Sequence, residues 1–204
     1  MKKSIVFLTL IGGIFLAGCM EPEEKTQDQL DEELRVALKD KASLSTVRDL
    51  IEQGADVNKR YEVPYTTQPE GPQIGFITPL SFPVSNGTGS DVSIIKELVD
   101  AGADAAVVFD DGSTLMHLAV LTERNGDIIR FLAQSGTPVD MQNALKQTPL
   151  FQAVYNENAS EIEALIEAGA DPNVRDADGQ TIYEMAQRYQ KQAGLEALRK
   201  ALGQ

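Results

Sequence analysis

The chain has 204 residues, with 18 Lys or Arg against 31 Asp or Glu, and its formal net charge at pH 7 is −13. This excess of negative charge argues against nucleic acid as a partner and against direct adhesion to anionic lipid. A single cysteine and a single histidine argue against a disulfide framework and against a typical zinc site. We therefore expect a fold held by packing, with no metal and no other cofactor.

The N-terminal segment from Met1 to Cys19, MKKSIVFLTLIGGIFLAGC, carries two lysines, then an apolar run, then small residues before the cysteine. This order is typical of an export signal, and the run is too short to be a dependable transmembrane anchor. Residues 16–19, Leu-Ala-Gly-Cys, resemble a bacterial lipobox, which implies a lipoprotein signal peptide over residues 1–18 and lipidation of Cys19. The alternative is an ordinary secretory signal with a chance cysteine.

The lipobox resemblance also implies a location. In lipoproteins of Gram-negative bacteria a residue other than Asp after the cysteine permits transfer to the outer membrane, and here that residue is Met20. We therefore expect an outer membrane lipoprotein that faces the periplasm and touches the membrane only through its lipid anchor. Residues 19–29 are acidic and poor in large apolar side chains, which predicts a flexible tether. Removing Lys2 and Lys3 with the signal leaves 16 basic against 31 acidic residues, a net charge of −15.

From residue 30 onward the chain repeats itself. Closing glycines stand at Gly54, Gly102, Gly136 and Gly169, so the numbering advances by 48, then 34, then 33. Helix-opening threonines stand at Thr78, Thr114, Thr148 and Thr181, with advances of 36, 34 and 33. Counted back from each glycine, positions −7, −4 and −3 are apolar in all four repeats. This spacing is that of a buried helical face, so the repeats are expected to stack.

One repeat shows the unit most clearly. Thr148 can cap a helix through its hydroxyl, Pro149 suits the first helical position, and Gly169 supplies the left-handed residue that ends the second helix. A period of about 33 residues with a Thr-Pro-Leu-His-x-Ala opening resembles the ankyrin-repeat family. The resemblance implies an all-α solenoid of about five helix-turn-helix repeats with short hairpin fingers, over residues 30–204. The repeats are expected at about 30–58, 78–106, 114–140, 148–173 and 181–204.

His117 stands at the histidine of the family's Thr-Pro-Leu-His opening. In the family this residue ties neighbouring turns together, so we assign it a structural role alongside Thr148 and Gly169. A catalytic role would need a positioned partner that the pattern does not supply. The sequences Asp110-Asp111-Gly112 and Asp176-Ala177-Asp178-Gly179 lie in hairpin turns and lack the spaced ligands of an EF-hand, so turn residues are the simplest interpretation.

The regular pattern breaks in the first finger, where residues 60–77 form a long insertion with three prolines. Pro83 in the following helix predicts a short or bent helix, with residues 86–90 as an enlarged loop. The insertion is either a recognition loop or a cover over the first two repeats. The candidate partner-binding residues are its aromatic side chains and nearby acids: Tyr61, Tyr65, Phe76, Glu62, Glu70, Asp110 and Asp111.

The ankyrin resemblance implies a non-enzymatic, monomeric protein-binding module with a protein partner and no nucleic acid. Its acidic charge suits a basic toxin or periplasmic enzyme, although acidity can also serve solubility alone. The most concrete hypothesis is an immunity-type inhibitor of a toxin delivered into the periplasm, such as a type VI phospholipase effector. An accessory lipoprotein for a periplasmic enzyme or envelope complex is the alternative in the same class. A small-ligand carrier or an enzyme with the finger as a lid is the alternative in another class.

Overall fold

The computed structural model describes residues 25–62, 75–86, 91–121 and 125–204. The predicted lipidation site Cys19 and the finger residues Tyr65 and Glu70 lie outside these ranges. Within them, no helix combines the length and the apolar character needed to cross a bilayer.

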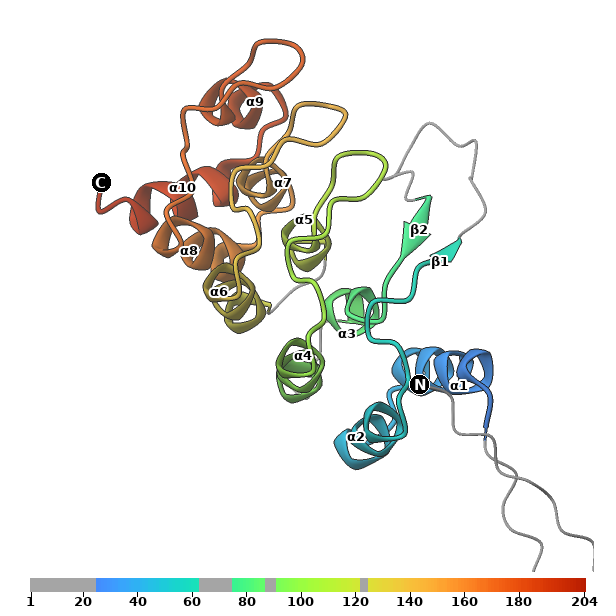
Figure 1. Ribbon diagram of the computed structural model, residues 1–204. Helices are drawn as coiled ribbons and strands as arrows, with labels where there is room; N and C mark the ends of the chain where they lie inside the picture. The colour runs from blue at the N-terminus through green and yellow to red at the C-terminus, as the bar shows by residue number, and fades with distance from the viewer. Residues whose placement is uncertain (1–24, 63–74, 87–90, 122–124) are drawn as a thin grey trace, which may run out of the picture.

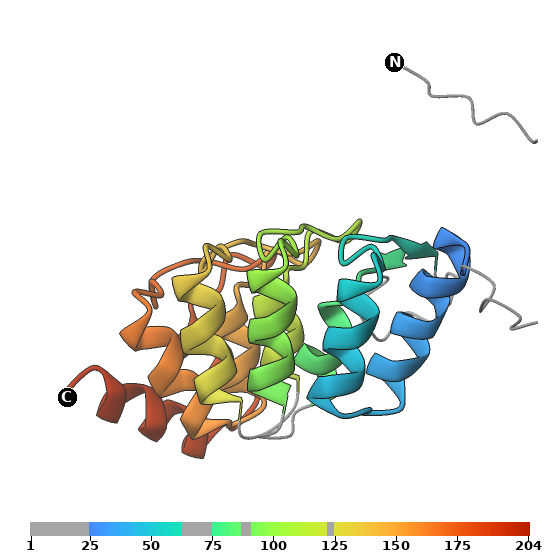
Figure 2. The same ribbon diagram turned by 60° about the horizontal axis from the view of Figure 1, so that its bottom comes forward.

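The described residues form ten helices that follow one another in five pairs (Figure 1). The pairs run in a single row from the first repeat to the last, and the connecting fingers leave the row at the same edge (Figure 2). This arrangement confirms the predicted all-α repeat solenoid. The pairs are α1 Gln27–Lys39 with α2 Leu44–Glu52, α3 Ser81–Asn86 with α4 Asp91–Asp100, α5 Leu115–Ala119 with α6 Gly126–Gln134, α7 Pro149–Tyr155 with α8 Ala159–Glu167, and α9 Ile182–Arg188 with α10 Gln192–Ala201.

The helix boundaries follow from caps that the sequence supplies. The Thr148 hydroxyl accepts the Phe151 N–H at 3.4 Å, and Pro149 occupies the first turn of α7. Thr181 makes a reciprocal capping box with Glu184 at the start of α9. Gly169 ends its repeat at φ +91°, a backbone conformation that residues with a Cβ rarely adopt. The first and second helices of a repeat are therefore set by local chemistry.

The core runs through the row of helices rather than lying at one centre. At position −7 before each closing glycine the side chain is completely buried, and at position −4 it is buried in every repeat. The residues at position −3 are partly buried and pack against this core. The buried set at positions −7 and −4 is Val47 and Leu50, Ile95 and Leu98, Ile129 and Leu132, and Ile162 and Leu165. Each pair thus buries its apolar face against its neighbours, as a stacked repeat requires.

Polar contacts between consecutive repeats fix their register. The Asp104 N–H donates to Asn58 Oδ1 at 2.8 Å, and Asn58 Nδ2 donates to the Gly102 carbonyl at 2.9 Å. Two repeats later, the Asp171 N–H donates to Asp140 Oδ1 at 3.1 Å. In both cases the Asp of Gly-Ala-Asp gives its N–H to a side chain of the preceding repeat.

The first helix corrects one predicted boundary. Helix α1 begins at Gln27, so three residues assigned to the tether are helical. The cause is a capping box at Thr26, whose hydroxyl accepts the Gln29 N–H while Gln29 Oε1 accepts the Thr26 N–H at 2.9 Å. A helix cap needs no apolar side chain, so the prediction that the first repeat begins at Leu30 missed the cap at Thr26.

The inserted finger starts and ends as a short antiparallel hairpin, the two-stranded sheet of an otherwise helical fold. Strand β1, Tyr61–Glu62, pairs with β2, Phe76–Ile77, and residues 63–74 between them are outside the described residues. The next helix, α3, has six residues and contains Pro83, in agreement with the expected short helix. Residues 87–90 of the expected enlarged loop are also outside the described residues.

Candidate functional site

Tyr61, the first candidate of the inserted finger, is held against the first two repeats. Its hydroxyl donates to the Asp31 carbonyl at 2.6 Å. Its ring meets the Phe82 ring edge-on at a centroid distance of 6.4 Å, and the Arg35 guanidinium lies 5.8 Å from its centroid. Burial raises the pKa of Tyr61 to about 12, and the negative charges of Asp31 and Glu32 act in the same direction. Tyr61 therefore has few free groups to offer a partner.

Phe76, on the returning strand, is only 8% exposed. Its ring packs on Phe109, in the finger between the second and third repeats, at a centroid distance of 5.6 Å, and the Arg60 guanidinium lies 4.3 Å from its centroid. Glu62, on the opposite strand, is exposed. A cover over the first repeats thus accounts for both described aromatic rings of the finger. Partner binding by Tyr61, Glu62 and Phe76 stays a prediction.

A buried carboxylate fixes the base of this finger. Asp31 is 2% exposed, and its Oδ1 accepts the Asp56 N–H at 2.8 Å and the Gln27 side-chain amide at 2.7 Å. The Lys59 ammonium lies 3.2 Å from Asp31 Oδ2. Burial works to raise the pKa of Asp31, but these donors outweigh it and hold the pKa below its usual value. The first finger is thereby pinned to α1.

The acidic turn before the third repeat is occupied by its own backbone. Asp111 Oδ1 accepts the Ser113 N–H and Oδ2 accepts the Ser113 hydroxyl, each at 2.9 Å. The side chain of exposed Asp110 lies against Gly75 of the inserted finger. Among the residues that the structure describes, no group of three or more His, Cys, Asp or Glu side chains could hold a metal ion. Partner binding by Asp110 and Asp111 stays a prediction.

His117 bridges two turns. Its Nε2 lies 3.1 Å from the Gln147 carbonyl in the next finger, and its Nδ1 lies 3.1 Å from the Thr114 N–H in its own. A carbonyl can only accept, so Nε2 carries the proton and Nδ1 accepts. Burial lowers the pKa of His117, which favours the neutral ring that this arrangement needs. The ring links the third repeat to the fourth.

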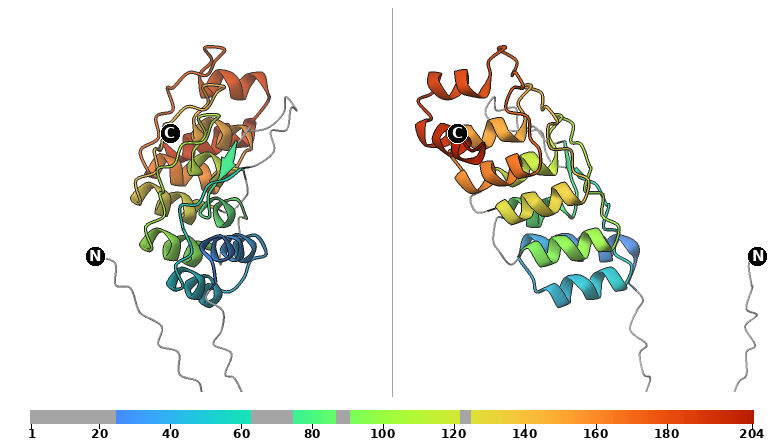
Figure 3. Two further views of the ribbon diagram at one scale, coloured as in Figure 1. Left: turned by 45° about the vertical axis from the view of Figure 1, so that its right-hand side comes forward. Right: turned by 90° about the vertical axis from the view of Figure 1, so that its left-hand side faces the viewer.

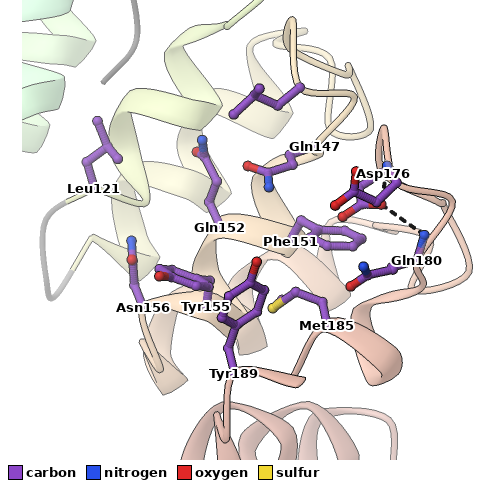
Figure 4. A pocket seen from close by; sticks show the side chains of 12 residues that line it. Leu121, Gln147, Phe151, Gln152, Tyr155, Asn156, Asp176, Gln180, Met185 and Tyr189 are labelled. Carbon is purple, nitrogen blue, oxygen red and sulfur yellow. Dashed lines mark hydrogen bonds between the residues drawn. The ribbon is translucent and has the colours of Figure 1, made fainter. Parts of the chain in front are cut away.

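A groove of about 480 Å³ opens on the other half of the molecule, between the first helices of the last two repeats and their fingers (Figure 4). We call it the inner groove. It receives side chains from α7 and α9, from the residues that end α5, α7 and α9, and from two successive fingers. Its lining residues are Leu121, Leu145, Gln147, Phe151, Gln152, Tyr155, Asn156, Asp176, Asp178, Gln180, Met185 and Tyr189.

The inner groove gathers exposed apolar side chains. Tyr155 is 45% exposed, Tyr189 49%, Leu121 47% and Leu145 61%. Within the described part of the chain only two other large hydrophobic side chains are exposed, Val36 at 41% and Val108 at 42%, and both are less exposed than these four. Isolated exposed apolar residues need no explanation, but a polar-rimmed cluster in a hollow marks an interaction site. The composition of the groove is that of a binding surface.

The two tyrosines form the wall of this surface. Their rings meet edge-on at a centroid distance of 5.6 Å and an angle of 77°. The Lys191 ammonium lies 4.5 Å from the Tyr155 ring centroid, and the Arg188 guanidinium lies 5.6 Å from that of Tyr189. These cations orient the rings and leave roughly half of each ring to solvent. Tyrosines of this kind are frequent anchors of protein interfaces.

The sequence-based candidates did not include these residues, although a signal was present. From Leu121 to Tyr155 and from Tyr155 to Tyr189 the numbering advances by 34 each time, close to the repeat length. They stand where the first helix of each repeat ends, outside its buried face. An apolar residue that recurs at the repeat period but off the core stripe predicts a continuous surface patch.

Comparison with known proteins places this architecture in a family. The sequence profile described as "Ankyrin repeats (3 copies)" matches residues 80–176 and 116–203, together more than half of the chain. The chain belongs to the ankyrin-repeat family. The first helix pair and the inserted finger precede the matched residues, and the inner groove lies within them. The family and its stacked surfaces make the chain a protein-interaction module.

Three relatives illustrate the similarity. The chain is 39% identical over 80 residues to "NF-kappa-B inhibitor alpha" of Gallus gallus, covering 38% of this chain and 25% of that protein. It is 34% identical over 99 residues to "B-cell lymphoma 3 protein homolog" of Mus musculus, covering 47% and 22%. It is 36% identical over 89 residues to "Palmitoyltransferase Hip14" of Drosophila melanogaster, covering 43% and 14%. The chain thus spans a quarter or less of these relatives.

Proposed function

We propose that this ankyrin-repeat protein binds and inhibits a protein partner through the inner groove, without catalysis. The observation that carries the proposal is the convergence of Tyr155, Tyr189, Leu121 and Leu145 in one hollow while the described finger aromatics are packed. Half-exposed aromatic side chains in a polar rim gain free energy when a partner removes them from water. The NF-kappa-B inhibitors are precedents for inhibition by a related repeat array.

We propose, second, that Cys19 is acylated and that residues 20–26 tether the array to the periplasmic face of the outer membrane. Support comes from the Leu-Ala-Gly-Cys sequence and from Met20 after it. Substituting Cys19→Ser should abolish incorporation of labelled palmitate and release the protein from the membrane fraction. Labelling that persists in this variant would contradict the anchor.

Within this role we propose an immunity-type inhibitor of a basic toxin that acts in the periplasm. A tether keeps the inhibitor near the membrane where such a toxin would act. The net charge of −15 expected after signal removal would speed the encounter with a basic protein and make it sensitive to salt. The proposal of a basic toxin as partner rests on the acidic charge of this chain and on its proposed location at the membrane.

Co-expression with a toxin candidate encoded beside this gene tests the proposal. Cells that export the toxin should survive with the wild-type protein and die with the Tyr155→Ala, Tyr189→Ala double variant. A Val36→Ala variant, at an exposed apolar side chain outside the groove, is the matched control and should protect. Full protection by the double variant would refute the groove as the inhibitory site. Toxicity that the wild type leaves unchanged would refute the immunity role for that toxin.

A further inference from the structure

Three glutamines line the inner groove with side-chain amides that have no hydrogen-bond partner among the residues that the structure describes. Within the described part of the chain, the carboxamides of Gln147, Gln152 and Gln180 make no hydrogen bond, and Gln152 Oε1 is buried without a partner. Figure 4 shows all three around the ring of Phe151. Amides that line a groove without partners in the protein can form hydrogen bonds with a ligand that enters it.

The chemistry of these amides identifies the group they suit. A carboxamide donates and accepts hydrogen bonds side by side, and a peptide unit of a main chain offers the same pair in complementary order. Gln147 and Gln180 occupy equivalent positions, each directly before the helix-opening Thr148 or Thr181 of its repeat. The amides therefore recur along the groove from one finger to the next. An extended main chain can meet such a series, whereas the main chain of a helix is already paired.

The charges around the groove give a further constraint. Asp176 and Asp178 stand at the finger edge, and Asp176 Oδ1 accepts the N–H groups of Asp178 and Gln180 at 3.0 and 2.9 Å. Lys191 and Arg188 stand beside the tyrosines, and Arg188 lies 3.8 Å from Asp178 Oδ2. The cations repel a basic side chain from the tyrosine wall, and the carboxylates attract one at the finger edge.

We infer that the inner groove binds an extended segment of the protein partner. Its main chain pairs with the carboxamides of Gln147, Gln152 and Gln180. An apolar side chain of the segment packs on the tyrosine wall, and a basic side chain meets the carboxylates of Asp176 and Asp178. The inference rests on the proposed function, because it takes the inner groove as the partner site, and it adds which part of a partner is recognised.

Short random linear peptides displayed on phage are the probe, selected on the full chain purified in mild detergent. Selected peptides should carry an apolar residue and a Lys or Arg.

N-methylation of a contacted peptide bond removes its N–H and keeps every side chain, so it should weaken binding about tenfold. Gln152→Leu should cause a similar loss. Gln192→Leu, at an exposed side chain that begins α10 outside the groove, is the matched control and should bind like wild type. Asp178→Asn should reduce the preference for a basic residue.

The outcomes separate this inference from the proposed function. Peptides that lose binding to the Tyr155→Ala, Tyr189→Ala variant but ignore N-methylation and Gln152→Leu would overturn main-chain recognition and leave the groove as the site. The inference would also be overturned if no selected peptide bound the wild-type protein more tightly than that double variant. If the wild type still protected cells while the double variant did not, the ligand would be a folded surface of the partner. If cells that carry the Tyr155→Ala, Tyr189→Ala variant are still protected from the toxin, the proposed function itself is contradicted.

Discussion

The two halves of the array use aromatic side chains in opposite ways. In the first half Tyr61 and Phe76 of the inserted finger pack inward, and the Tyr61 hydroxyl is satisfied by the Asp31 carbonyl. In the second half Tyr155 and Tyr189 remain about half exposed at the end of regular helices. A cation lies over one face of each of these four rings. The presence of aromatic residues in a segment therefore does not indicate a binding surface, whereas the exposure of their rings does.

The views along and across the array agree with this division. The fingers of the last three repeats run side by side, whereas the two ends of the inserted finger pair as strands β1 and β2 (Figure 1, Figure 3). The described aromatic rings of the insertion are packed against neighbouring residues of the first repeats. A regular stack leaves equivalent side chains aligned and open to a ligand. The following substitutions test this contrast.

The largest effect is expected at Phe76. Phe76→Ala removes a buried ring that packs on Phe109, and it should lower the free energy of unfolding by about 3–4 kcal/mol. Tyr155→Ala, at a half-exposed ring, should cost less than about 1.5 kcal/mol. Urea denaturation of both variants gives the comparison. Equal losses, or a larger loss for Tyr155→Ala, would erase the distinction between the two halves.

Asp31 should give the next largest effect. Asp31→Ala removes the acceptor of the Asp56 N–H and leaves Lys59 without its buried partner, so about 1–3 kcal/mol of stability should be lost. Asp28 lies at the same 3.2 Å from the Lys59 ammonium but is solvent-exposed, so Asp28→Ala should cost less than about 0.5 kcal/mol. Hydrogen exchange at the Asp56 amide should accelerate only in the Asp31 variant.

The link between the halves should depend on pH through His117. Its pKa in the folded protein lies below the ordinary value of 6.5, so between these two values the unfolded chain binds more protons. The contribution of His117 to stability should be constant above about pH 7.5 and fall as the pH drops below 6.5, by at most about 1.4 kcal/mol per pH unit. The slope between about pH 7 and 5 should be smaller in His117→Gln. An unchanged slope in that variant would assign the pH dependence to other groups.

The smallest effect separates two tyrosine hydroxyls. Tyr61→Phe removes the hydrogen bond to the Asp31 carbonyl and should cost about 1 kcal/mol. In the described residues the Tyr189 hydroxyl has no hydrogen bond, so Tyr189→Phe should leave the free energy of unfolding unchanged. Thermal or urea denaturation of the two conservative variants is sufficient. A cost at Tyr189 equal to that at Tyr61 would show that both tyrosines are structural.

The repeats could be predicted because local chemistry repeats with them. Thr148, Gly169 and the apolar residues at fixed offsets set caps and buried faces without help from distant parts of the chain. The start of α1 could not be placed at the first leucine, because the capping box at Thr26 depends on polar atoms alone. The position of Tyr61 and Phe76 could not be predicted either, because their partners Asp31 and Phe109 belong to other repeats, far away in sequence.

The inner groove could not be predicted from the sequence for a related reason. Its residues come from two fingers and from the first helices of three repeats, and each repeat supplies only a few of them. The regular spacing of Leu121, Tyr155 and Tyr189 was readable, but periodicity alone does not separate a core position from an exposed one. The finger aromatics were more conspicuous in the sequence because they interrupt the pattern. A segment that interrupts the repeat pattern therefore does not have to expose its aromatic side chains.

Site-specific photocrosslinking in cells tests the central claim most directly. A benzophenone side chain replaces Tyr155 or Tyr189 in the inner groove, Glu62 on the inserted finger, or Val36 at the exposed first repeat. We predict a crosslinked protein adduct from the two groove positions, with a lower yield when the Gln152→Leu substitution is added, and no adduct from Glu62 or Val36. An adduct from Glu62 and none from Tyr155 or Tyr189 would contradict it, and would place recognition in the inserted finger.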